Sequence, residues 1–127
     1  MKKIIQTDHA PAPVGPYNQA IQHGNTLYVS GQIALESSTG NLITSDIEAE
    51  THQVMRNLKA ILEEAGADFE HVLKCSVFVS DMENYSRINA VYQQYFNDDT
   101  APARELVEVA NLPKYVNVEI SLIAHVD

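Results

Sequence analysis

The sequence predicts an α/β fold of the α+β type, in which two helices cover one face of a mixed sheet. Two amphipathic helical patterns, over residues 47–65 and 85–96, alternate with segments of strand character. The chain has 127 residues, of which 45% are hydrophobic and 20% charged, and these values suit one compact core. We therefore expect a single domain that spans residues 1–127.

The N-terminal region is expected to start with a loop and continue as a hairpin. Prolines recur through residues 10–16, and because they remove backbone donors and favour extended neighbours, they indicate a stiff loop. Residues 17–22 then read as a strand, His23-Gly24-Asn25 as a turn and residues 26–33 as the returning strand. A second turn is predicted at residues 38–41.

The first helix has signals at both ends. Ser45 followed by Glu48 predicts a capping box, and Gly66 predicts a left-handed stop. Between them the apolar residues recur at helical spacing and form one stripe: Ile47, Val54, Met55, Leu58, Ile61, Leu62 and Ala65.

The second half of the chain alternates in the same way. Residues 72–79 are rich in β-branched residues and predict a strand, residues 85–96 a helix, and residues 97–100 a polar loop. Two further strands are expected in the last third. In the final one, over residues 115–126, apolar side chains occupy every second position and should face the helices. Parity then places Tyr28 and Tyr115 on the uncovered face, where exposed aromatic surface indicates a subunit interface.

Charge and composition exclude several classes of partner. The net charge of −9 repels nucleic-acid phosphates and anionic lipid, so neither is an expected partner. The single cysteine, Cys75, suits a reducing compartment, and no apolar stretch has the length of a signal or a membrane span. We expect a cytoplasmic protein. The five histidines show no metal-ligand spacing, so no metal site is expected.

Several short segments, in order and at matching spacing, resemble the RidA/YjgF family of reactive-intermediate deaminases. They run from the proline loop almost to the C-terminus: residues 12–20, Ser30-Gly31-Gln32-Ile33, residues 53–62, residues 89–92, Pro102-Ala103-Arg104, residues 107–110, Leu112-Pro113 and Val118-Glu119-Ile120. The resemblance implies a chorismate-mutase-like fold and a homotrimer whose sheets form a central barrel, with three clefts between subunits. It also implies hydrolysis of 2-iminopropanoate and 2-iminobutanoate without a cofactor.

Two residues carry the implied chemistry. By its motif position, Arg104 holds the substrate carboxylate, and a guanidinium can grip that planar group with two parallel hydrogen bonds. The alternative is an arginine in an ordinary surface ion pair. Glu119 would orient water or move a proton, although a glutamate on the polar side of a strand is more commonly only solvated.

The resemblance also places five residues in the substrate pocket. They are Tyr17, Ser30, Gly31, Asn89 and Leu106. Tyr17 and Asn89 also fit ordinary structural roles, and Ser30 and Gly31 could simply form the end of a strand, with the glycine in a bulge. Three positions depart from the usual family pattern. Glu105 adds a negative charge that could pair with Arg104, Leu106 makes the pocket more apolar, and Ala34 replaces a proline.

Two main functions remain open at this level. The first is hydrolytic deamination of 2-imino acids to 2-oxo acids and ammonia, with the small acid as the only ligand. The second is a non-catalytic trimer that senses 2-oxo acids and regulates a partner, which Glu105 and Leu106 would favour. A chaperone-like or ribonuclease-like role is a third possibility, disfavoured by the acidic charge.

Overall fold

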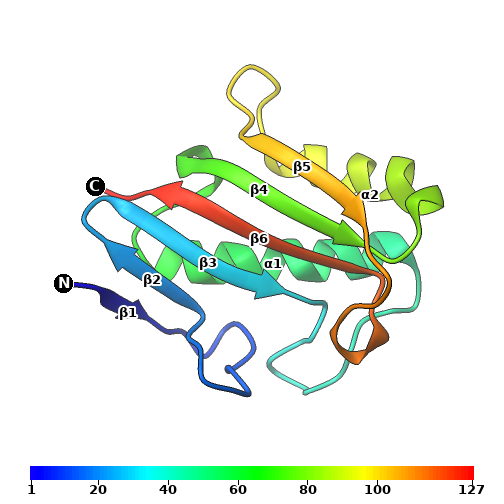
Figure 1. Cartoon of the computed structure of the whole chain (residues 1–127), viewed down its shortest axis with the longest axis horizontal. Helices are drawn as coiled ribbons and strands as arrows, with labels where there is room; N and C mark the ends of the chain where they lie inside the picture. Colours follow the sequence, from blue (N-terminus) through cyan, green and yellow to red (C-terminus); the bar gives the residue numbers. More distant parts are fainter.

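The chain folds as one mixed sheet with both helices on the same face (Figure 1), as the sequence predicts. A computed structural model describes all residues from 1 to 127. The six strands lie in the order β1-β2-β3-β6-β4-β5, and only the β4–β5 pair is parallel. The strands are β1 (Lys3–Ile5), β2 (Ala20–His23), β3 (Thr26–Gln32), β4 (Val72–Val79), β5 (Ala103–Glu108) and β6 (Val118–His125), and the helices are α1 (Ile47–Glu64) and α2 (Tyr85–Tyr92).

Helix α1 forms as predicted, but the predicted position of its N-cap is wrong by one residue. Asp46, not Ser45, is the N-cap, and its side chain accepts a 2.7 Å hydrogen bond from the Ala49 backbone N–H. Asp46 has the same capping chemistry as Ser45 and adds a negative charge at the positive end of the helix dipole. Gly66 ends the helix region with a φ of 77°, as expected. The apolar stripe of α1 packs into the core.

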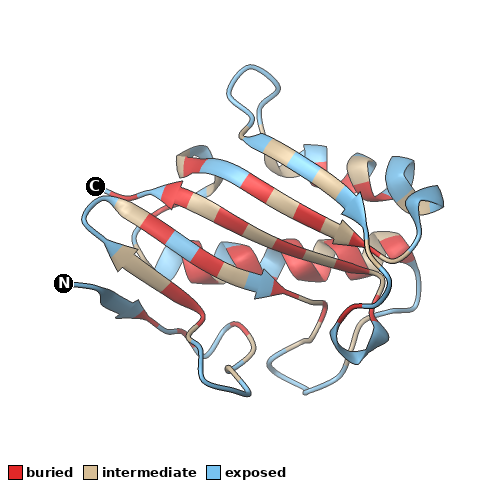
Figure 2. Ribbon diagram, in the orientation of Figure 1, coloured by how far each residue is buried: buried red, intermediate tan, exposed pale blue.

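The alternation in β6 is confirmed by burial. Val118, Ile120, Leu122 and Ala124 are buried and face the helices, whereas Glu119 and Ser121 on the other side are only partly covered. The same alternation is visible as banding along the central strands in Figure 2. Strand β4 alternates too, with Cys75, Val77 and Val79 in the core. The central strands therefore have one face in the core and one open face.

The proline loop continues further than the sequence predicts, because β2 begins at Ala20 rather than at Tyr17. Gln19 explains the difference. Its buried side chain accepts a hydrogen bond from Thr7 N–H and donates to the carbonyl oxygens of Thr7, Ala10 and Pro11. One side chain thus satisfies the backbone of a loop that has no strand partner.

Two other elements are shorter than predicted. Helix α2 ends at Tyr92, and a 3₁₀ turn (Gln93–Tyr95) continues the pattern. The last strand begins at Val118 because Lys114 and Tyr115, with φ values of 56° and 55°, form a left-handed turn before it. Tyr115 therefore belongs to a turn and not to the strand.

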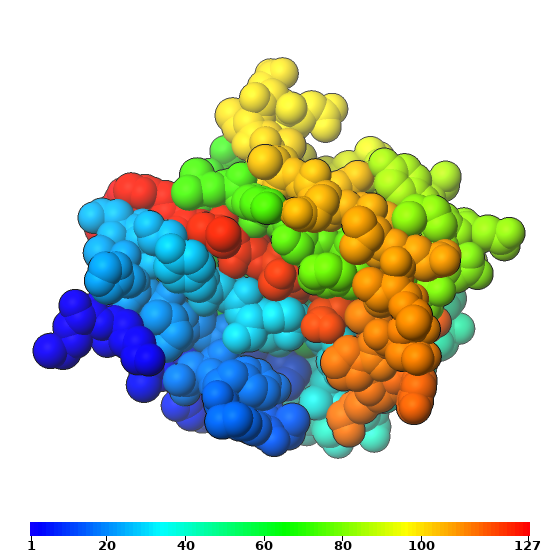
Figure 3. Space-filling model, viewed as in Figure 1, coloured from blue at the N-terminus to red at the C-terminus, as the bar shows by residue number.

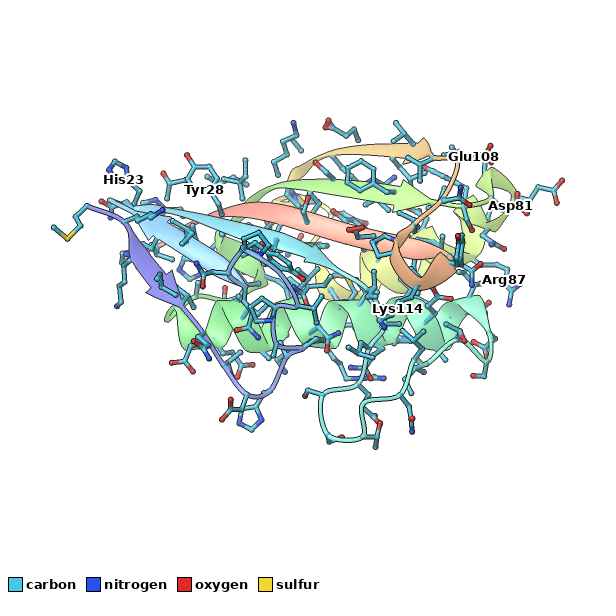
Figure 4. The ribbon with its side chains drawn as sticks, turned by 60° about the horizontal axis from the view of Figure 1, so that its bottom comes forward. His23, Tyr28, Asp81, Arg87, Glu108 and Lys114 are labelled. Atoms are coloured by element: carbon cyan, nitrogen blue, oxygen red, sulfur yellow. The ribbon has the colours of Figure 1, made fainter.

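The face of the sheet opposite the helices is uncovered and carries aromatic surface. Tyr28 projects from this face of β3 (Figure 4) and is 51% exposed. Tyr115 is also exposed, at the end of the same sheet. Neither helix is long and apolar enough to cross a bilayer.

Candidate functional site

A pocket of about 380 Å³ opens at one end of the sheet, where three segments meet. The proline loop forms one wall, the end of β3 forms the floor, and the turn before β6 forms the other wall. In Figure 3 the proline loop (blue) and the later turn (orange) stand on either side of the end of β3. The lining includes Tyr17, Ser30, Gly31 and Glu119, which are four of the residues expected from the sequence, together with Lys114.

The floor of the pocket is made by a β-bulge. Between Val29 and Gln32, β3 has one more residue than the facing segment Leu122 to Ile120 of β6. Ser30 and Gly31 occupy the bulge. Ser30 is fixed there because its Oγ donates to the Asn18 carbonyl oxygen at 2.6 Å and its N–H donates to the Gln19 carbonyl oxygen at 2.9 Å.

Gly31 leaves the space that the Glu119 side chain occupies. A β-carbon at position 31 would lie 2.8 Å from Glu119 Cδ and closer still to Oε2. Burial against this backbone raises the pKa of the Glu119 carboxyl above its ordinary value of 4.5. The pocket therefore holds a carboxylate that can accept a proton at a higher pH than a solvated glutamate does.

Arg104 lies in a second cluster, at the β5 edge. Its guanidinium donates to Asn89 Oδ1 at 2.8 Å and to the Tyr85 hydroxyl oxygen at 3.1 Å, and its Cζ lies 4.9 Å from the centre of the Tyr92 ring. Helix α2 supplies all three partners. Tyr85 and Tyr92 lie within the helix predicted over residues 85–96. Their role beside Arg104 has no sequence signal, because it depends on how α2 docks beside β5.

Glu105 does not form an ion pair with the guanidinium of Arg104. Successive strand residues point to opposite faces, so Arg104 faces the helices while Glu105 faces the open side, where it pairs with Lys74 at 3.1 Å. Leu106 shares the side of Arg104 and packs against the hydrophobic core. Within one chain it does not line the pocket beside Glu119.

The expected site residues thus form two groups on opposite faces of the sheet. Arg104 is in register with the fully buried Cys75, which faces the helices, whereas Glu119 is in register with Phe78 on the open face. One group offers a cation with donors for a carboxylate, and the other offers a partly desolvated carboxylate. No set of three or more His, Cys, Asp or Glu side chains is arranged to hold a metal ion.

A model of one protein family, described as endoribonuclease L-PSP, matches residues 7–126 of the chain. The solved structure of the YjgF gene product from E. coli superimposes with a TM-score of 0.91 at 42% identity, covering 97% of this chain and 98% of that one. The chain belongs to the RidA/YjgF family.

Two curated relatives of this RidA/YjgF chain extend the comparison. A RutC family protein from Synechocystis is 52% identical over 96% of this chain and 95% of its own length. The mouse 2-iminobutanoate/2-iminopropanoate deaminase is 42% identical over 98% of this chain and 91% of its own length. The family therefore includes a 2-imino acid deaminase.

Proposed function

We propose that the protein hydrolyses 2-iminopropanoate and 2-iminobutanoate to the 2-oxo acids and ammonia, in the cytoplasm and without a cofactor. The observation that carries the proposal is the guanidinium of Arg104, which two polar partners and an aromatic face hold in place while no carboxylate of its own chain pairs with it. A small planar acid fits such a fork. The mouse deaminase, at 42% identity, supports the choice of substrate.

The active assembly in this proposal is a homotrimer. Arg104 and Glu119 lie on opposite faces of their own sheet, so a single substrate can meet both only if the two residues come from different subunits. Packing the open sheet faces into a central barrel covers Tyr28 and sets the β5 edge of one subunit beside the pocket of the next. Each trimer then has three equivalent clefts.

The chemistry needs only positioning and modest polarisation. Arg104 anchors the carboxylate, and the Gly31 backbone and Leu106 bound the reacting end of the molecule. Glu119 orients a water molecule toward the imine carbon, and addition of this water gives a carbinolamine. The carbinolamine hydroxyl gives up its proton while the nitrogen takes one up, so the carbon–oxygen double bond forms and the nitrogen leaves as ammonia. The products are one 2-oxo acid and one ammonia for each imine and water consumed.

A coupled assay tests this function. A threonine dehydratase supplies the 2-imino acid, and the accelerated loss of the imine is followed with the purified protein present. We expect wild-type protein to accelerate the loss, Arg104→Ala to lower kcat/KM by about 100-fold, and Arg104→Lys to recover only part of it, because an ammonium cannot form two parallel bonds. Arg87→Ala is the control, since it removes an exposed arginine paired with Glu48 and should leave kcat/KM unchanged.

The same experiment addresses the other roles. Retained binding of 2-oxobutanoate without any acceleration would support a sensor and contradict the enzyme. Glu105, which would have favoured a sensor by occupying Arg104, is instead 3.1 Å from Lys74. The family model's description mentions an endoribonuclease, but the net charge of −9 disfavours RNA binding. RNA cleavage that survives moderate salt, with no effect on the imine, would overturn the proposal.

A further inference from the structure

Glu50 is a carboxylate sealed inside the protein without a cation. It lies in the first half of α1 and is 0% exposed, and none of the ion pairs in the structure includes it. A buried charge of this kind persists only when hydrogen bonds replace the lost water. Three donors do so here. Oε2 accepts from the backbone N–H groups of Asn117 (2.7 Å) and Val118 (3.2 Å), and Oε1 accepts from Asn117 Nδ2 (2.8 Å).

Asn117 is held from the opposite direction as well. Its backbone oxygen accepts from Ser80 N–H at 3.1 Å, and its Oδ1 accepts from Ser80 Oγ at 3.3 Å. Ser80 directly follows β4. The backbone and side chain of Asn117 are therefore tied to α1 on one side and to the end of β4 on the other, so the start of β6 has little freedom to move.

The segments on either side of Asn117 and Val118 both contribute to the pocket. On the N-terminal side lies the left-handed turn of Lys114 and Tyr115, and Lys114 lines the pocket (labelled in Figure 4). On the C-terminal side lies Glu119, two residues beyond Asn117. Two consecutive non-glycine residues at positive φ are strained, and such strain persists only where the surrounding structure over-determines it. The hydrogen bonds that Glu50 accepts from Asn117 and Val118 hold the chain directly after this turn.

We propose that Glu50 is a positioning residue of the active pocket: through Asn117 and Val118 it fixes the entry to β6, and so places Glu119 against Gly31 and Lys114 in the opposite wall. Glu50 touches neither substrate nor pocket. Its effect passes through the backbone of residues 117–118. The inference rests on the proposed function for its catalytic readout, but the placement of Glu119 can also be measured without activity.

Two substitutions distinguish the effect of the hydrogen bonds to Glu50 from the effects of its side-chain volume and its charge. Glu50→Met keeps a side chain of similar length and leaves all three donors without an acceptor. Glu50→Gln can keep every bond: its Oε1 accepts from the two backbone N–H groups, and a flip of the Asn117 amide lets Asn117 accept from the new Nε2 and donate to Ser80 Oγ. Leu62→Ala is the stability control, because it opens a cavity under α1 without touching residues 117–118.

For Glu50→Met we expect kcat to fall about 10- to 100-fold while KM changes much less, since a misplaced catalytic group slows chemistry but leaves the Arg104 anchor intact. Glu50→Gln should stay within about threefold of wild type in both parameters. Leu62→Ala should keep the wild-type kcat even where its melting temperature is as low as that of Glu50→Met. The inference is overturned if folded Glu50→Met keeps wild-type kcat, if Leu62→Ala loses as much, or if Glu50→Gln is as impaired as Glu50→Met.

A ¹³C titration of the glutamate side-chain carboxyls, with the Glu119 signal assigned from Glu119→Gln, separates this inference from the proposed function. We expect the Glu119 pKa to move toward its ordinary value in Glu50→Met and to stay raised in Glu50→Gln. If wild type shows no deamination but the titration separates the two variants, the positioning role stands and the proposed function fails. If wild type deaminates but Glu119 titrates alike in all variants, the positioning role is wrong.

Discussion

At position 31 the pocket has no room for a β-carbon, and this gives a direct test of the Gly31–Glu119 contact. The atoms that an alanine would meet belong to the far end of the Glu119 side chain, which can swing away at little cost to the fold. We therefore expect Gly31→Ala to fold normally, with a melting temperature within a few degrees of wild type, and to lose about 10- to 100-fold in kcat, because the displaced carboxylate no longer orients water toward the imine carbon. Steady-state kinetics and thermal unfolding measure the two effects.

Gly15→Ala is the matched control for this substitution. A β-carbon there would lie 3.6 Å from Tyr17 ring atoms, which is ordinary contact, and Gly15 needs no positive φ. It should leave kcat unchanged and stabilise slightly, by about 0.4–1 kcal/mol, by restricting the unfolded chain. Equal kinetic losses in the two variants would show that the proline loop, and not the Glu119 carboxylate, limits the reaction.

The raised pKa of Glu119 predicts where the rate falls at low pH. The residue acts as an ionised carboxylate in the proposed reaction, and burial raises its pKa above 4.5, so the ionised fraction declines at a higher pH than for a solvated glutamate. We expect kcat to fall on the acidic side with an apparent pKa above 4.5, and this limb to disappear in the slow Glu119→Gln variant. Glu105→Gln should keep the limb. An unchanged acidic limb in Glu119→Gln would assign it to another group.

Among the secondary-structure elements, α1 offers the clearest test of a boundary, because two adjacent residues could cap it. Asp46 accepts the bond from Ala49 N–H, whereas Ser45 makes no such bond in the structure. Asp46→Ala should lower the free energy of unfolding by about 1 kcal/mol, and Ser45→Ala should change it by less than about 0.5 kcal/mol. Urea denaturation measures both. A larger loss of unfolding free energy in Ser45→Ala than in Asp46→Ala would show that Ser45 is the N-cap.

The same pair of residues shows why elements are easier to predict than their ends. Periodicity and parity identified both helices, β4 and the core face of β6, because these depend on neighbouring residues in the chain. The end points depend on distant partners. Strand β2 starts late because Gln19 binds Thr7, twelve positions away. Strand β6 starts only after the left-handed turn of Lys114 and Tyr115, and Asn117, directly before the strand, donates to Glu50 in α1.

The residues of the candidate site were indicated in part by the sequence. Motif positions indicated Glu119, Gly31 and Arg104, and strand parity alone would have separated Arg104 from Glu105, which point to opposite faces. The aromatic partners of Arg104 on α2 and the role of Glu50 were not predictable. Both depend on the docking of a helix against a strand that is far away in the sequence.

At the scale of the whole molecule, one face of the sheet has no element of the same chain packed against it. It carries Tyr28 and the Lys74–Glu105 pair, and both helices lie on the other face of the sheet (Figure 1). Exposed aromatic surface on a sheet usually marks an interface. A trimer would cover it, and would also set the Arg104 edge of one subunit against the Glu119 pocket of another.

Complementation between inactive subunits tests this assembly directly. Arg104→Ala and Glu119→Gln chains, each with little activity alone, are co-expressed with different tags and purified as mixed trimers. If each cleft takes Arg104 from one subunit and Glu119 from its neighbour, every mixed trimer has both residues intact in one of its three clefts, and about a third of wild-type kcat should return. Mixing Arg104→Ala with the Arg104→Ala/Glu119→Gln double variant should restore nothing. If the first mixture also stays inactive while the trimers form, both groups act within one chain, and the shared cleft is wrong.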